Sequence, residues 1–518
     1  MIRLVLKTMV LTEVRLRLRR LSTIVALLAV AAITWAMIDD PASGGALIVV
    51  DNTRVLYTSS ALALGSASLA SLLFALGGFF LARGRVAEDI RSGAGGVIGA
   101  TPVGSLLFLA GRWLGAVAYL GLLMLAFMGT VLACHAVRGD GPIQPLIYLS
   151  SFCITLLPCV FFAASCAVLF DSWAPLMGKR GDVLFFFVWV AQVGMVAAVQ
   201  HHGAAALRAT LFDFTGMTAS FTTLASHVDT RHLSLGSSSF NAALAPIMLP
   251  EFMWSAKIIA MRCASAVLAL LPLVPAAWLF HRYSPDKVKA GRSRQRRSPL
   301  AVLDGWLRPL SRLARPLFPL AARLPGWCGQ AVADVALTLI ASPSAIAALL
   351  VALAASVVVP VQALGAVVMA GVAVWGILAS DISTRDFQAG TEEMTGAVEG
   401  GSARRYLRQY AATAMLGLMF TGVAAARFAH HDPVRAGAVV AGVLALAALA
   451  NMMGRGSRTP RLFMSLFLFG LYVAVNAIKV PMVDAVGFNG VANAQSALAW
   501  LAIGCAALAG GFAINRRP

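Results

Sequence analysis

Residues 82–112 read ARGRVAEDIRSGAGGVIGATPVGSLLFLAGR and separate two long apolar runs. The segment begins with five charged residues in nine positions, continues through a glycine-rich stretch and then becomes apolar again. The charged residues are Arg83, Arg85, Glu88, Asp89 and Arg91. Because a bilayer core is crossed by about 20 apolar residues, a polar segment between two such runs is typical of a loop that joins two membrane spans.

The composition supports a membrane protein. Of the 518 residues, 59% are apolar and only 12% are charged, whereas a soluble domain carries about 25% charged residues. The mean hydropathy is +0.81. Runs such as Ala436–Gly454 have no polar face, which argues against a water-soluble fold. The sequence therefore predicts an all-α polytopic membrane protein.

Twelve apolar runs are candidates for membrane spans. They cover residues 21–38, 61–82, 114–136, 146–170, 183–199, 261–280, 344–360, 361–380, 409–426, 436–453, 462–479 and 497–513. The uncharged stretch 344–380 is too long for one helix, so we expect a tight turn near Pro360. We therefore expect about twelve transmembrane helices.

The formal net charge of +19 is concentrated in two clusters. Residues 1–20 hold six Lys/Arg and one acid, and residues 282–323 hold eleven Lys/Arg and two acids. Basic clusters beside spans mark the cytoplasmic side and attract anionic lipid, and no aromatic-interleaved groove for nucleic acid is evident. We expect both termini in the cytoplasm and residues 200–256 outside. The abundance of Ala and the excess of Arg over Lys indicate a bacterium with a GC-rich genome, so we expect the chain in a bacterial cytoplasmic (inner) membrane.

The opening segment has a counterpart in the second half of the chain. Residues 379–409 read ASDISTRDFQAGTEEMTGAVEGGSARRYLRQ and align with 82–112 without a gap. The aligned pairs include Asp89/Asp386, Ile90/Phe387, Gly93/Gly390 and Val97/Met394, and Glu13 aligns with Asp334 near the start of each half. Six spans return the chain to the side where it began, so the repeat is parallel. We expect a first half at 1–283, a basic cytoplasmic linker at 284–327 and a second half at 328–518.

The first loop carries a family resemblance. The pattern R-x3-D-x3-G (Arg85, Asp89, Gly93), followed by ATPVGSLLFLAGRWLGA, resembles the permease subunits of ABC-2 type ABC transporters, and FDFTG at 212–216 is similar to a sequence in larger members. The resemblance implies two six-helix repeats, each with an N-terminal interfacial helix and a cytoplasmic coupling helix that docks on an ATP-binding subunit. The second loop departs from the pattern, because Val398, Glu399, Gly400 and Gly401 replace TPVG.

An amphipathic helix over 85–97 would place Val86, Ile90, Gly93 and Val97 on one face, available to a groove on a partner. Its charged residues would largely point away from that face. The expected partner-binding residues of the two loops are Arg85, Glu88, Asp89, Ile90, Arg91, Gly93, Arg385, Asp386, Phe387, Gly390, Glu392 and Glu393. A solvated loop whose charges merely keep it out of lipid is the alternative.

The sequence offers no catalytic, metal or cofactor motif. The Gly178-Lys179 pair lacks the surrounding pattern of a nucleotide-binding loop, so ATP and Mg²⁺ are expected on two partner ABC ATPases. Seven histidines fall at or beyond the expected outer surface, without ligand spacing: His135, His201, His202, His227, His232, His430 and His431. The seven cysteines are scattered and form no CxxC.

The expected function is that of a transporter subunit rather than an enzyme. We expect it to export an apolar or amphipathic substrate, because the span walls are largely uncharged. Two alternatives stay open: an ion-coupled secondary transporter with 6+6 helices, and a non-transport membrane scaffold or enzyme. The near absence of Asp, Glu and Lys from the spans argues against the first, and the lack of an acidic catalytic cluster argues against the second.

Overall fold

The computed structural model describes residues 2–19, 21–196, 209–228, 232–280, 283, 305–397, 400–477 and 479–516. The contacts divide the chain into two compact units, Met1–Ser293 and Arg294–Pro518. The part of the predicted linker that precedes residue 305 lies outside the described residues, as do His201, His202, Val398 and Glu399.

Within the described residues, eight helices are long and apolar enough to cross a membrane. They are Ser59–Arg91, Ser105–Arg138, Pro145–Ser172, Ala256–Leu279, Val361–Ala389, Gly401–Ala429, Pro433–Ser457 and Ala494–Arg516. The number rises to ten if two bent helix pairs each count as one span: Arg3–Leu18 with Thr23–Met37, and Gly326–Ala341 with Pro343–Val358. Because a helix satisfies its backbone hydrogen bonds internally, it can lie in lipid. The chain is an all-α, multi-pass membrane protein.

The sequence predicted about twelve membrane spans, two more than the ten counted here. The difference comes from two predicted spans whose helices are shorter than a full membrane crossing. Helices α8 (Lys179–Gly194) and α23 (Arg461–Asn476) each have 16 residues. The turn predicted near Pro360 is confirmed, since α17 (Pro343–Val358) ends before this proline and α18 begins at Leu364.

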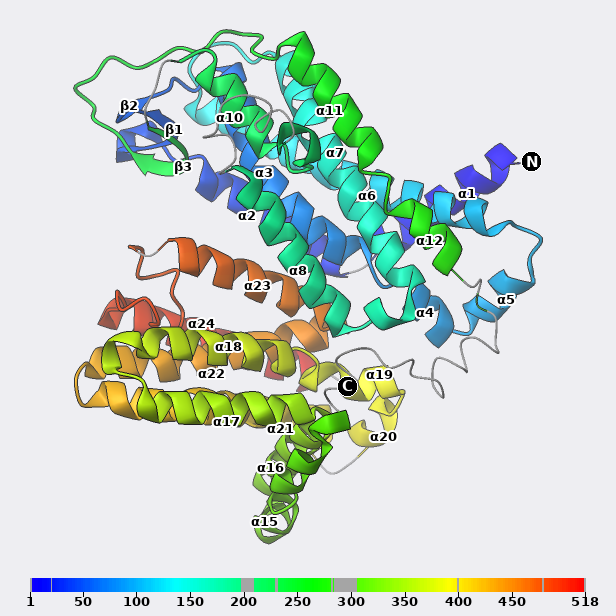
Figure 1. Ribbon diagram of the computed structural model, residues 1–518, viewed down its shortest axis with the longest axis vertical. Helices are drawn as coiled ribbons and strands as arrows, with labels where there is room; N and C mark the ends of the chain where they lie inside the picture. Colours follow the sequence, from blue (N-terminus) through cyan, green and yellow to red (C-terminus); the bar gives the residue numbers. More distant parts are fainter. Residues whose placement is uncertain are drawn as a thin grey trace. The chain divides into compact units, whose positions relative to one another are not determined.

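The first unit is built around α6 and α7 (Figure 1). Helices α1 and α2 pack on α6, and α3, α11 and α12 pack on α7. The helices are α1 (Ile2–Leu18), α2 (Leu21–Met37), α3 (Ser59–Ala82), α4 (Arg85–Arg91), α5 (Ala94–Ala100), α6 (Ser105–Arg138), α7 (Pro145–Ser172), α8, α10 (Met217–Ala225), α11 (Ala256–Leu268) and α12 (Leu273–Leu279). Aromatic side chains fill the core between α3, α7 and α8, where Phe79 stacks on Phe185.

The second unit is built around α21 and α22. Helix α21 contacts α16, α17, α18, α22 and α24, and α22 packs closely on α24. The helices are α15 (Leu317–Arg323), α16 (Gly326–Ala341), α17, α18 (Leu364–Ala379), α19 (Arg385–Ala389), α20 (Glu392–Gly396), α21 (Gly401–Ala429), α22 (Pro433–Ser457), α23 and α24 (Ala494–Arg516). A Cβ added at Gly504 would lie 2.7 Å from the Ala445 Cα. The α22–α24 contact therefore needs small residues, as is common between membrane helices.

A small antiparallel sheet accompanies the helices of the first unit. It has the order β2-β1-β3, with β1 at Gly45–Val50, β2 at Thr53–Arg54 and β3 at Leu233–Ser239. Asp51 and Asn52 connect β1 to β2 with φ of 44° and 67°, the backbone of a two-residue hairpin that Asp and Asn tolerate. The buried apolar run of β1 is too short for a span, and this sheet was not among the elements expected from the sequence.

Tyr57 joins this sheet to two helix ends. Its hydroxyl accepts a hydrogen bond from the Leu47 N–H at 2.9 Å and donates one to the Asp39 carbonyl at 3.0 Å. Its own N–H donates to Asp140 Oδ2 at 2.9 Å, just beyond α6. The ring is 2% exposed, and burial raises the pKa of Tyr57 to about 12.

Replacing Tyr57→Phe should destabilise the first unit by about 1–3 kcal/mol, because the Leu47 N–H and the Asp39 carbonyl lose their buried partner. A raised pKa means that the folded state holds the phenolic proton more tightly than the unfolded state. This part of the stability is complete below about pH 10 and is lost as the pH rises toward 12. The melting temperatures of wild type and variant, measured in detergent at pH 8, 10 and 11, should therefore converge. A gap that stays constant or widens with pH would contradict this assignment.

Candidate functional site

The loop after α3 forms two short helices rather than the single helix expected over 85–97. Gly84 (φ 95°) precedes α4, and Gly93 (φ 75°) separates α4 from α5. A left-handed backbone at Gly93 cannot continue an α-helix, so Val97 belongs to a different helix from Val86 and Ile90. Val86 is buried, Ile90 is 40% exposed and Val97 is 71% exposed.

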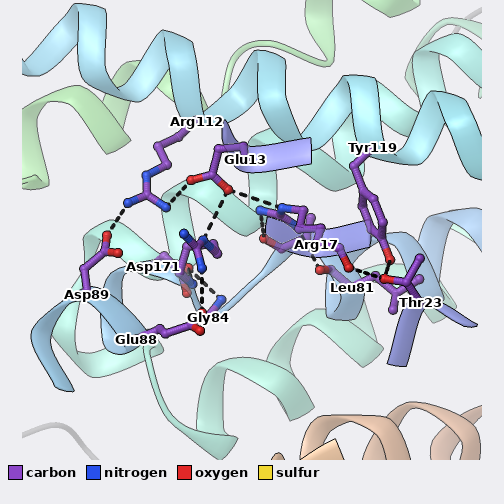
Figure 2. Close-up of polar contacts among 12 residues, drawn as sticks. Glu13, Arg17, Thr23, Leu81, Gly84, Glu88, Asp89, Arg112, Tyr119 and Asp171 are labelled. Atoms are coloured by element: carbon purple, nitrogen blue, oxygen red, sulfur yellow. Dashed lines mark hydrogen bonds and ion pairs between the residues drawn. The ribbon is translucent and has the colours of Figure 1, made fainter. Parts of the chain in front are cut away.

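Glu13 of α1 lies at the centre of a buried charge cluster (Figure 2). Its carboxylate accepts a hydrogen bond from Arg112 of α6. Arg85 Nε of α4 and Arg17 Nε of α1 lie 3.2 Å and 3.4 Å from Glu13 Oε2. All four side chains are no more than 10% exposed. One carboxylate therefore connects α1, α4 and α6.

The same cluster holds Asp89 of α4. Arg112 donates to the Asp89 carboxylate with its second terminal nitrogen, and the Tyr283 hydroxyl donates to Asp89 Oδ2 at 2.6 Å. Burial raises the pKa of Tyr283 above its usual range, which keeps its donor proton in place. Arg85 and Asp89, expected to face a partner, are therefore both buried and bonded within the chain.

Two acids on neighbouring elements hold the start of the loop. Asp171 Oδ2 accepts hydrogen bonds from the N–H groups of Gly84 and Arg85 at 2.7 and 3.0 Å. Arg83 is paired with Asp182 of α8, and its Nε lies 3.6 Å from Asp171 Oδ1. Arg17 also donates to the carbonyls of Leu81 and Ala82 at the end of α3 and stabilises that helix C-terminus. The loop is thus held on α1, α6 and α7 together.

The second unit has a related but more exposed cluster. Arg408 Nε of α21 lies 3.0 Å from Asp334 Oδ2 of α16, and Gln409 Nε2 of α21 donates to Asp386 Oδ2 of α19 at 3.3 Å. The side chains of Asp334 and Asp386 are 22% and 18% exposed. As in the first unit, one acid lies on an early helix and one on the loop. Here Asp334 of α16 and Asp386 of α19 are both bonded to α21, the long helix after the loop.

The remaining predicted loop residues fall into two groups. Glu392 is bonded inward to Arg455 at 2.9 Å and to Arg405 at 3.5 Å, and Arg385 donates to Thr338 Oγ1 at 2.7 Å. The second group is exposed or half-exposed and comprises Glu88, Ile90, Arg91, Gly93, Gly390 and Glu393. Phe387 is half-buried, with the Arg458 guanidinium 5.1 Å from its ring centre. Glu392 is therefore bonded within the unit, whereas Glu393 is exposed.

The most exposed apolar side chains of the two loops are an aligned pair. Val97 is 71% exposed on α5, and Met394 is 75% exposed on α20. Both follow a left-handed glycine, Gly93 in the first loop and Gly390 in the second. Each loop thus combines an inward face bonded to its own unit with an outward apolar residue.

Sequence reasoning missed the inward face. Glu13 is an acid within a basic helix and Arg112 a charge within an apolar one, and an isolated ionisable residue in such a place signals a buried partner. Arg262 of α11 was missed in the same way. It is 2% exposed and donates to four carbonyls, those of Ile154, Thr155, Asp213 and Phe214. Residues 213–216 therefore form a buried turn fixed by Arg262, whereas Phe212 is 47% exposed.

Among the described residues, no group of three or more His, Cys, Asp or Glu side chains could hold a metal ion. His135, expected at the outer surface, is 2% exposed and bonds the Tyr148 hydroxyl at 2.7 Å through Nδ1.

No family model, curated protein or solved structure matches the chain.

Glu13→Gln should lower the stability of the first unit by about 3 kcal/mol or more, because it removes the negative charge that three buried guanidiniums share. The same change at the partly exposed Asp334 (Asp334→Asn) should cost about 1 kcal/mol, and Glu88→Gln, whose carboxylate is 45% exposed, should cost less than about 1 kcal/mol. Melting temperatures of the purified variants in detergent test this order. Equal losses for Glu13→Gln and Glu88→Gln would show that Glu13 is not the centre of the cluster.

Proposed function

We propose that this chain is the membrane-spanning subunit of an ABC-2 type transporter, with both permease halves fused in one polypeptide. The observation that carries the proposal is the double loop α4–α5 and its counterpart α19–α20. Each pair of short helices follows a membrane helix, precedes a long one and is bonded by an acid to that long helix. Each also presents an exposed apolar side chain. Loops of this kind are suited to bind separate ATP-binding subunits.

The order of elements in the two units supports a parallel repeat. In chain order, α1–α2, α3, α4–α5, α6, α7, α8 and α11–α12 have the counterparts α16–α17, α18, α19–α20, α21, α22, α23 and α24. In each unit the first two helices pack on the long helix after the loop, α6 or α21. Six spans per unit, with α8 and α23 included, would give the twelve spans expected from the sequence.

The buried cluster gives this function a mechanical basis. A partner that moved α4 and α5 would move Asp89 and Arg85, and both are bonded through Arg112 and Glu13 to α6 and α1. Displacement of the loop would therefore reach two helices at once. ATP and Mg²⁺ would act on two partner subunits, and the chain would export an apolar or amphipathic substrate across a bacterial cytoplasmic membrane.

The topology of this proposal can be measured. Cysteines placed at the exposed positions Ser239 and Gly305, in a chain whose seven native cysteines are replaced, should be labelled from opposite sides of the membrane. Ser239 should react from outside and Gly305 only after the membrane is opened, because basic segments stay in the cytoplasm. Impermeant maleimide on intact cells gives the readout. Labelling of both cysteines from the same side would rule out the proposed topology.

The docking proposal predicts a defined complex of one chain with two ATPase subunits. Chains purified from the native membrane should carry an ABC ATPase in this ratio, measured by intact-complex mass spectrometry. Val97→Asp with Met394→Asp should reduce the bound ATPase at least tenfold, because buried apolar anchors carry most interface energy, about 2 kcal/mol or more each. Met248→Asp, equally exposed in the segment expected outside, should leave binding unchanged.

A chain that folds and is purified without any ATPase, or a Val97/Met394 variant that retains it fully, would contradict the proposal. The main alternative is an ion-coupled carrier, and the buried Arg262 beside Asp213 is the feature that favours it. Arg262 donates hydrogen bonds to four backbone carbonyls. We therefore assign Arg262 a structural role rather than a role in ion transport. Uptake into vesicles that follows a proton or sodium gradient without ATP would support the carrier instead.

A further inference from the structure

A cavity of about 660 Å³ opens in the second unit between α16, α21 and α24. Its lining comprises Trp327, Gly400, Ala403, Arg404, Leu407, Tyr410, Ala411, Leu508, Phe512 and Arg516. The volume is within the range of small-molecule sites, about 300–1,000 Å³. None of these residues was assigned a role from the sequence.

The cavity is a groove with a polar end and an apolar end. Its α21 residues recur at spacings of three or four from Ala403 to Ala411, and its α24 residues at intervals of four from Leu508 to Arg516. These intervals place each set on one helix face. At 1.5 Å per residue, the α21 face extends over about 12 Å. Arg404 and Arg516 lie at one end, whereas Leu407, Ala411 and Leu508 line the rest.

Helices α21 and α24 pack so that their arginine-bearing ends lie side by side. Ser402 near the start of α21 donates to the Asn515 carbonyl near the end of α24. Further along, the Tyr406 hydroxyl donates to the Ala507 carbonyl at 3.3 Å. The helices are therefore antiparallel, and the start of α21 with Arg404 lies beside the end of α24 with Arg516. Small residues at Gly400, Ala403 and Ala411 leave the space beside this contact open.

We propose that this groove binds one anionic phospholipid, with its phosphate at Arg404 and Arg516 and an acyl chain along Leu407, Ala411 and Leu508. Two guanidiniums at the mouth select a negative headgroup, and Arg is the side chain best matched to phosphate oxygens. The apolar remainder selects a hydrocarbon chain, which a free phosphate lacks. Trp327 at the same end is typical of the membrane interface, where indole rings sit at headgroup level. The inference needs only a multi-pass membrane protein and is independent of the proposed transport function.

The test is lipid binding to the purified full chain by native mass spectrometry, with phosphatidylglycerol and phosphatidylcholine as probes. Wild type should bind phosphatidylglycerol at least tenfold more tightly than phosphatidylcholine. Arg404→Gln with Arg516→Gln should abolish that preference. The charge-matched control, Arg308→Gln with Arg312→Gln, removes two exposed arginines outside the groove and should keep it.

Two further measurements distinguish the occupant. Ala411→Trp fills the apolar end and should weaken binding of both lipids at least tenfold without touching either arginine. Free glycerol phosphate should fail to displace phosphatidylglycerol at a hundredfold excess. Retention of the preference in the Arg404/Arg516 variant, its loss in the control pair, unchanged binding to Ala411→Trp, or displacement by glycerol phosphate would each overturn the proposal.

Discussion

The carboxylate of Glu13 is surrounded by three guanidinium groups that come from three helices, and the position of the first loop depends on this arrangement. Taking these charges out of water is costly, so their clustering is not explained by stability alone. The cluster connects α1, α4 and α6 through one carboxylate. Arg112 bonds Glu13 and Asp89 at once, so α1 and α4 cannot shift independently of α6.

Much of the molecule outside this cluster follows from simpler constraints. Long apolar runs must form helices because lipid offers no partner to an open backbone. Small residues let α22 and α24 approach closely, and aromatic side chains fill the wider space around α3 and α7. These contacts place the helices, but they do not fix the polar loops at their ends. The ionic clusters do so.

The sequence predicted the all-α membrane class and the turn at Pro360, because hydrophobicity and proline position are local signals. It did not predict that Arg85 and Asp89 point inward, since their partners Glu13 and Arg112 lie far away along the chain. The break at Gly93 was missed because the apolar residues keep a helical spacing across this position. The left-handed backbone of Gly93 nevertheless ends the helix. The hairpin at Asp51–Asn52 was also missed. Asp and Asn are common turn residues, but here they lie among apolar residues that resemble a membrane span.

The two loops differ in stiffness. In the first, the side chains of Glu13 and Asp89 are 7% and 8% exposed, whereas those of Asp334 and Asp386 in the second are 22% and 18% exposed. Water competes with the second set and lowers the free energy of local opening. A force applied to the first loop would be transmitted nearly rigidly, while the same force on the second would partly be absorbed as local deformation. The chain thus contains one firmly held loop and one that yields more easily.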